Sequence, residues 1–392
     1  MAANLLVCAS QEAAARPYRF RETGIHVYTL EEMLYHCFRE WKQSVDDVCS
    51  DEMTDWVQNA LGLSLVAAKM RAFAAVEGYA KRLLAFLGIT DYISPAQLDS
   101  LKQELAAWEK RLEWERLKER ADDLLNHDDA ERAALLYKKA LGFAVNAALL
   151  NNLGIAHMAQ GQYAPAVDAL EQAVALEPEN VTLLLHLAEA LILYGEYSRA
   201  QAALAEAERL EGGETADVLY FKGEIQFYSS VYTQAVSYYE QAAALCYNPQ
   251  YLYRLSDAYV KLRQFDKALD ALADVREKDK AFLKQQAEVY VQAGNVPAAI
   301  KCMERALLND KNSVDVWIRL ARYHRLDYDL DRASKAVVKA LGLAPENPKA
   351  LLEHARIRNA QGSVKDYQSI LHKVLAGFKN KYRENAALEV AE

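Results

Sequence analysis

The side chains best suited to bind another molecule form an aromatic set and a basic set in the second half of the chain. The aromatic set is Tyr220, Phe221, Phe227, Tyr228 and Tyr253. The basic set is Arg319, Arg322, Arg325, Lys349 and Arg356. Tyrosine and arginine are frequent binding hot spots, and a planar guanidinium group pairs well with a carboxylate. Together the two sets predict a site for a protein segment or peptide that carries an acidic side chain or a free C-terminal carboxylate.

Sequence motifs that carry catalysis or hold a cofactor are not found. The chain has no phosphate-binding loop, no G-x-G-x-x-G, no H-E-x-x-H and no G-x-S-x-G. Its cysteines are Cys8, Cys37, Cys49, Cys246 and Cys302. They are odd in number and form no C-x-x-C pair, so neither a zinc site nor a disulfide framework is indicated. We therefore expect no enzymatic activity, no catalytic residue, no cofactor and no metal.

The composition indicates a helical protein with an acidic balance. Alanine, the best helix former, is abundant, whereas Gly and Pro number only 15 and 8 in 392 residues. The net charge of −9 disfavours binding to nucleic acid or to anionic membranes, which needs a basic surface. The N-terminus does not resemble a signal peptide, and no apolar run is long enough to cross a bilayer. Unpaired cysteines fit a reducing compartment, so we predict a cytoplasmic protein.

Small residues recur along most of the chain at a step of about 34 residues, which indicates an internal repeat. The first slot holds Ala121, Gly154, Ala188, Gly223, Ser256, Ala287, Ala321 and Ala355. The second slot holds Ala133, Ala166, Ala200, Ala235, Ala268, Ala299, Ala333 and the exception Tyr367. The third slot holds Ala140, Ala173, Ala207, Ala242, Val275, Ala306, Ala340 and Val374. Because small side chains let crossing helices approach closely, these slots predict the contacts within two-helix units.

One unit carries most of a known signature. Its residues are Leu150, Leu153, Gly154, His157, Gly161, Tyr163, Ala166, Leu170, Ala173 and Pro178. This pattern resembles the tetratricopeptide repeat (TPR) family over residues 114–380. The resemblance implies an all-α fold: a right-handed α-α superhelix of about eight helical hairpins. The units expected are 114–146, 147–180, 181–215, 216–248, 249–279, 280–313, 314–347 and 348–380, followed by a polar tail at 381–392. The unit 249–279 is about three residues short, which predicts a second helix that is either shortened or rotated.

The first 113 residues do not follow the repeat, and we expect a small, mostly helical domain there. Leu5–Cys8 and Ile25–Tyr28 have strand character and predict a short, two-stranded parallel edge. Thr29 and Glu32 form a capping-box pattern that opens a helix through Trp41. Further helices are expected over 51–61 and 64–87. Ser94-Pro95 starts another, which we expect to run without a loop into the first repeat.

The TPR resemblance also implies where a partner binds. The first helix of each hairpin lines the concave groove, with repeat positions 2, 5, 9 and 12 facing it. This places the aromatic and basic sets in the groove, after a more polar zone near Asn151, Asn152 and His186. Family members that clamp a chaperone's C-terminal carboxylate use five polar positions. Lys118 and Asn152 match that clamp, but Asp122, Thr182 and His186 do not, so chaperone-tail binding is not predicted.

The function predicted from the sequence is a non-catalytic scaffold or adaptor that binds a protein or peptide in the concave groove. An alternative is a regulator similar to bacterial peptide-sensing proteins, with an N-terminal effector domain gated by a peptide in the repeats. A less favoured alternative is an enzyme whose site lies in residues 1–113.

Overall fold

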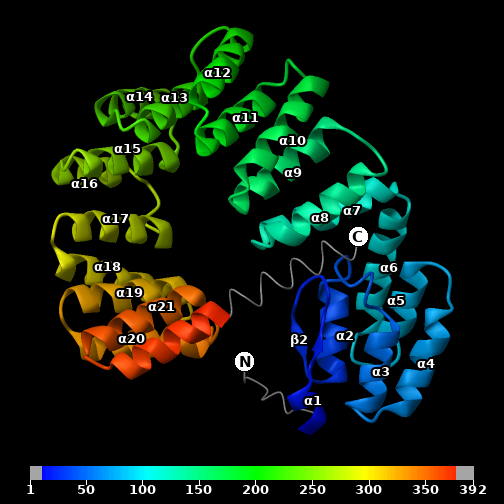
Figure 1. Ribbon diagram of the computed structural model, residues 1–392. Helices are drawn as coiled ribbons and strands as arrows, with labels where there is room; N and C mark the ends of the chain where they lie inside the picture. Colours follow the sequence, from blue (N-terminus) through cyan, green and yellow to red (C-terminus); the bar gives the residue numbers. More distant parts are fainter. Residues whose placement is uncertain (1–10, 377–392) are drawn as a thin grey trace. The chain divides into compact units, whose positions relative to one another are not determined.

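The structure is a computed structural model that describes residues 11–376, and its contacts divide the chain into two compact units, Met1–Glu196 and Tyr197–Glu392. Helices follow one another through both units, with one small sheet near the N-terminus (Figure 1). The prediction of an all-α chain of repeated helical hairpins is confirmed. The predicted domain boundary at residue 113 lies inside the first unit and stays a prediction.

The first unit begins with short helices and a two-stranded sheet. Its elements are α1 (Gln11–Ala15), β1 (Tyr18–Arg19), β2 (His26–Val27), α2 (Leu30–Arg39), α3 (Asp51–Asn59), α4 (Ser64–Ala74), α5 (Tyr79–Leu87) and α6 (Pro95–Glu109). Longer helices complete the unit: α7 (Glu113–Asn126), α8 (Ala130–Leu141), α9 (Ala147–Ala159), α10 (Tyr163–Leu176) and α11 (Val181–Tyr194). α7 packs against α8, and α9 packs against α10.

The second unit continues the same pattern. Its helices are α12 (Tyr197–Glu211), α13 (Ala216–Tyr228), α14 (Tyr232–Leu245), α15 (Pro249–Lys261), α16 (Phe265–Ala273), α17 (Lys280–Gln292), α18 (Val296–Asn309), α19 (Val314–Leu326), α20 (Leu330–Leu343) and α21 (Pro348–Ala360). Residues 364–376 are also helical. From α12 to α21 each helix packs against the next one in the chain. Of the two alternatives predicted for the second helix of residues 249–279, the shortened helix is observed, since α16 has 9 residues and α14 has 14.

The repeated small residues lie in the packed interior. All eighteen alanines of the three slots have no exposed surface, and Gly154, Gly223 and Ser256 are also buried. A Cβ atom built on Gly154 would lie 2.6 Å from Leu170 Cγ, and one built on Gly223 would lie 2.6 Å from Tyr239 Cε1. Neither glycine therefore leaves room for a larger residue, because real carbon atoms do not pack so closely.

Several N-terminal boundaries differ from the prediction. The sheet is antiparallel, pairing Tyr18 with Val27, and the predicted strand Leu5–Cys8 lies outside the described residues. The helix expected over 64–87 breaks after Ala74, because Gly78 adopts a left-handed φ of +92° before α5 begins. α6 starts at Ser94-Pro95 as predicted but does not run into α7. The carboxylate of Glu115 accepts the Leu112 backbone N–H at 2.9 Å and opens α7 separately.

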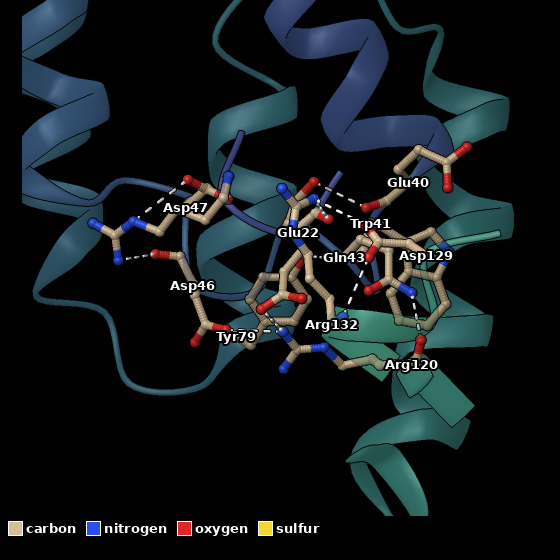
Figure 2. A network of polar contacts seen from close by, with 12 residues as sticks. Glu22, Glu40, Trp41, Gln43, Asp46, Asp47, Tyr79, Arg120, Asp129 and Arg132 are labelled. Carbon is tan, nitrogen blue, oxygen red and sulfur yellow. Dashed lines mark hydrogen bonds and ion pairs between the residues drawn. The ribbon is translucent and has the colours of Figure 1, made fainter. Parts of the chain in front are cut away.

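A buried arginine joins the N-terminal segments to the first repeat helix (Figure 2). The Arg120 side chain on α7 is 5% exposed, and its Nη2 lies 2.8 Å from Asp46 Oδ2 and 3.4 Å from Glu22 Oε1. Its carbonyl accepts a hydrogen bond from Gln43 Nε2 at 3.1 Å. Glu22, Gln43 and Asp46 all precede α3, so these contacts hold the β-hairpin and the α2–α3 connection on α7.

Candidate functional site

The residues predicted to bind a partner all lie in the second unit, on the first helices of its hairpins. α13 carries Tyr220, Phe221, Phe227 and Tyr228; α15 carries Tyr253; α19 carries Arg319, Arg322 and Arg325; α21 carries Lys349 and Arg356. Whether they form one binding site stays a prediction. Their contacts show how many of them already have partners within the chain.

Part of the aromatic set surrounds an arginine that the sequence prediction did not include. The Arg254 guanidinium lies 4.4 Å from the ring centroid of Phe227 and 5.6 Å from that of Tyr228. It also makes two hydrogen bonds of 2.6 Å to the carboxylate of Glu224 on α13. The Tyr239 hydroxyl donates a third hydrogen bond to Glu224, which is buried. Phe227 and Tyr228 therefore shield an internal ion pair that joins α13 to α15.

The remaining aromatic residues are partly structural. The ring of Tyr220 lies 5.1 Å from the rings of both Phe221 and Tyr251, an ordinary distance for packed aromatic pairs. The Tyr251 hydroxyl donates to Asp217 at 2.5 Å, which again connects α15 to α13. Tyr253 is half-buried, and this burial raises the pKa of its phenol.

The basic set alternates with carboxylates. Arg319 Nε lies 3.3 Å from Asp315 Oδ2, and Lys284 of α17 reaches the same carboxylate at 3.0 Å. Burial alone would raise the pKa of Asp315, but Lys284 and Arg319 hold it below its ordinary value. Arg322 lies 3.6 Å from Glu288 of α17. These pairs link α17 to α19.

Two members of the basic set, Arg325 and Arg356, contact the same buried carboxylate. Glu353 on α21 is 2% exposed and accepts a hydrogen bond of 2.6 Å from Arg325 Nε. Arg356 approaches the other oxygen of Glu353 at 3.4 Å and keeps 61% of its side chain exposed. Lys349 is exposed, and no ion pair to its ammonium group is present within the described residues.

The ion pairs between hairpins were what sequence reasoning missed, although the spacing of their residues contains a signal. Glu224 and Arg254 are 30 residues apart, and Glu353 lies 28 residues after Arg325. Such separations are close to one repeat, and equivalent positions of successive first helices are neighbours. Opposite charges one repeat apart therefore indicate an ion pair between hairpins, while basic residues without such a partner are better candidates for binding.

Basic residues nevertheless exceed acidic ones on three consecutive first helices. α17, α19 and α21 together carry eight lysines and arginines and three carboxylates. By contrast, α13 and α15 carry three basic and three acidic residues. We call α17, α19 and α21 the basic face. Its charge opposes the net charge of −9 of the whole chain.

Helical hairpins with small residues at each crossing define a helical repeat protein, and comparison of the sequence with known families gives the family. Tetratricopeptide repeat models match residues 157–225, 250–280 and 280–323. The chain is a tetratricopeptide repeat protein. Repeats of this family support a role as a protein-interaction scaffold.

Several solved structures resemble parts of the chain at low sequence identity. A tetratricopeptide repeat protein from Parabacteroides merdae is 19% identical, with a TM-score of 0.44 over 59% of this chain and 93% of that chain. YrrB, described as a TPR protein with an unusual peptide-binding site, is 22% identical, with a TM-score of 0.34 over 47% and 97%. The APC/C assembly Cut9–Hcn1 gives 17% identity and a TM-score of 0.44 over 88% and 68%. No curated protein sequence matches the chain.

Within the described residues 11–376, no three or more His, Cys, Asp or Glu side chains lie where they could hold a metal ion. None of the helices in this range has the length and apolar character needed to span a bilayer.

Proposed function

We propose that this chain is a protein-interaction scaffold that binds an acidic protein segment on the basic face. The observation that carries the proposal is the excess of eight basic over three acidic residues on α17, α19 and α21. Charge complementarity of this kind favours a partner segment rich in Asp and Glu, and steers its approach. Arginine side chains that remain partly exposed add bidentate hydrogen bonds to its carboxylates.

The contacts suggest which predicted residues are available to a partner. Lys349 has no ion pair among the described residues, Arg356 is largely exposed, and the side chain of Arg322 is 39% exposed beside Glu288. Arg325 already forms an ion pair with the buried Glu353. We therefore assign binding mainly to Arg322, Lys349 and Arg356, with Arg319 beside them. The aromatic set on α13 and α15 extends the proposed site.

A peptide-display selection against the full chain tests this proposal. Enriched peptides are expected to carry an excess of Asp and Glu. The double variant Lys349→Glu/Arg356→Glu is expected to weaken binding of an enriched peptide at least tenfold. Removing two favourable charge contacts and adding two repulsive ones is worth more than about 1.4 kcal/mol, the equivalent of tenfold.

The matched control is Lys335→Glu/Lys339→Glu on α20, the second helix of the neighbouring hairpin. Both lysines are exposed, and the change in net charge is the same. The control is expected to leave peptide affinity within about twofold. Peptides without acidic bias, or equal losses in the two variants, would contradict the proposal.

The alternatives drawn from the sequence make different predictions. A peptide-gated regulator requires that bound peptide change the activity or protection of residues 11–113. An enzyme with its site in that region requires turnover that survives the substitutions in α21. A free C-terminal carboxylate as the recognised group requires that amidating the selected peptide abolish binding. A cytoplasmic location stays a prediction.

A further inference from the structure

A pocket of about 360 Å³ lies in the first unit and is not part of the proposed binding face. The residues that line it are Glu22, Thr23, Ile25, Glu40, Gln43, Asp123, Leu124, His127 and Asp129. They come from the β-hairpin, the α2–α3 connection, the last turn of α7 and the turn between α7 and α8. This volume lies within the range of small-molecule sites.

Four carboxylates line the pocket, and no lysine or arginine does. Two of these carboxylates form ion pairs with arginines. Arg120 lies 3.4 Å from Glu22, and Arg132 lies 3.2 Å from Asp129. Arg120 also forms an ion pair with Asp46 at 2.8 Å, so its charge is shared between Glu22 and Asp46. Burial raises the pKa of Glu22, and the nearby charges of Arg120 and Arg132 act against this rise.

The other two carboxylates are less well compensated. Within residues 11–376 the ion pair of Asp123 is with Lys42 at 3.8 Å, beyond hydrogen-bonding distance; burial raises the pKa of Asp123, and Lys42 and His127 act against this rise. Glu40 is half-buried, and its carboxylate has no ion pair or hydrogen bond within the described residues. In Figure 2 no dashed line reaches this carboxylate. Two of the four carboxylates therefore lack a close cationic partner in residues 11–376, which favours binding of a positively charged group in the pocket.

A neutral acceptor in the lining is also unsatisfied. Gln43 is 4% exposed, and its Oε1 atom has no hydrogen-bond partner in residues 11–376, although Nε2 donates to the Arg120 carbonyl. A buried acceptor without a partner costs about 1–3 kcal/mol. His127 Nδ1 donates to the Asp123 carbonyl at 2.8 Å, so its Nε2 is left as an acceptor when the ring is neutral. The lining donors Gln43 Nε2 and His127 Nδ1 already have acceptors, whereas acceptor atoms of the lining are left without donors from the described part of the chain.

We propose that this pocket binds an alkylammonium group, either the side chain of a lysine in a partner peptide or a free diamine. The ammonium group supplies three N–H donors and one positive charge to Glu40, Asp123 and Gln43. Ile25 and Leu124 give the pocket apolar walls for the alkyl chain.

Isothermal titration calorimetry on the full chain tests the proposal with three probes at 150 mM salt. They are 1,5-diaminopentane, the blocked peptide acetyl-Gly-Lys-Gly-amide and the uncharged control 1-pentanol. Saturable binding of the diamine or of the lysine peptide, with no binding of pentanol, is the expected result. Binding of the diamine alone identifies a free amine as the ligand, and binding of the peptide identifies a lysine side chain.

The variant Glu40→Gln is expected to weaken binding at least fivefold. Because the Glu40 carboxylate makes no ion pair or hydrogen bond with residues 11–376, the variant is expected to unfold at the temperature of the parent chain. The control Glu31→Gln changes the same charge on α2 at an exposed position outside the pocket and is expected to leave binding unchanged. Failure of both amines to bind, equal binding of pentanol, or equal effects of the two substitutions would overturn the proposal.

Discussion

At the scale of single residues, the close approach of paired helices depends on alanine and glycine, whose side chains have one carbon atom or none. The eighteen alanines of the three slots have no exposed surface, which their repeated spacing predicted. Gly154 and Gly223 sit where even a methyl group meets a neighbouring side chain at 2.6 Å. The sequence could predict these contacts because the same geometry repeats and selects the same residue type each time.

We expect Gly154→Ala and Gly223→Ala to lower the free energy of unfolding by about 1–2 kcal/mol each, since overpacking outweighs the higher helix propensity of alanine. Gly342 on α20 is the matched control, because nothing lies within 4 Å of a Cβ placed there. Gly342→Ala is expected to raise stability by up to about 1 kcal/mol. Chemical denaturation of the three variants provides the check, and a stabilised Gly154→Ala would show that the crossing is looser than described.

A buried histidine predicts a pH dependence. His36 is 6% exposed, contacts Thr23 Oγ1 through Nε2 at 3.0 Å, and packs against Phe20. Burial lowers its pKa to about 4, below the ordinary value of 6.5. Its contribution to stability is therefore complete above pH 6.5 and is lost as the pH falls towards 4, because the unfolded chain binds the proton first.

We expect His36 to account for about 1–2 kcal/mol of stability lost between pH 7 and pH 5. Urea unfolding of the parent chain and of His36→Gln at both pH values measures this contribution. The variant is expected to lose less stability on acidification than the parent chain. His26→Gln, at an exposed position on β2, serves as the control and is expected to behave like the parent chain. Identical acid sensitivity in the parent chain and His36→Gln would refute the assignment.

At the scale of helices, the sequence predicted the repeats better than the N-terminal region. The residues of each repeat helix predict that helix, and the equivalent residues of the other hairpins give the same prediction. The break at Gly78 and the separate start of α7 at Leu112 have no such equivalents. A single glycine in an apolar run is tolerated in many helices, so its left-handed φ could not be foreseen.

The first helices of successive hairpins are also joined by ion pairs. Such pairs cannot be recognised when each hairpin is analysed by itself. Basic side chains were predicted as binding residues from their type alone. The structure gives Arg325 a buried partner on the next first helix, Glu353, and leaves Lys349 without one in residues 11–376. Their availability to a partner protein therefore differs, although their residue types and repeat positions are similar.

The link through Glu353 predicts a local effect on stability. Glu353→Gln is expected to cost about 1–3 kcal/mol, because Arg325 loses its charged acceptor in a buried setting. Faster amide hydrogen exchange is expected in α19 and α21, with α13 and α14 unchanged, since repeats interact mainly with their neighbours. Glu346→Gln, an exposed change of equal charge before α21, is the control. Uniformly faster exchange through the second unit would contradict a local role.

At the scale of the whole molecule, the chain combines an acidic net charge with one basic face in its second unit and one acidic pocket in its first. The family and the repeated hairpins were predictable, because they depend on a pattern that recurs about every 34 residues. The pocket was not, because its lining comes from segments up to about 100 residues apart, such as Glu22 and Asp123, with no shared pattern.

Hydrogen–deuterium exchange of the full chain with and without a selected acidic peptide tests the proposed binding face most directly. The account predicts slower exchange in α17, α19 and α21, little change in α18 and α20, and loss of this protection in Lys349→Glu/Arg356→Glu. Protection confined to α18 and α20, or located in residues 11–113, would contradict it.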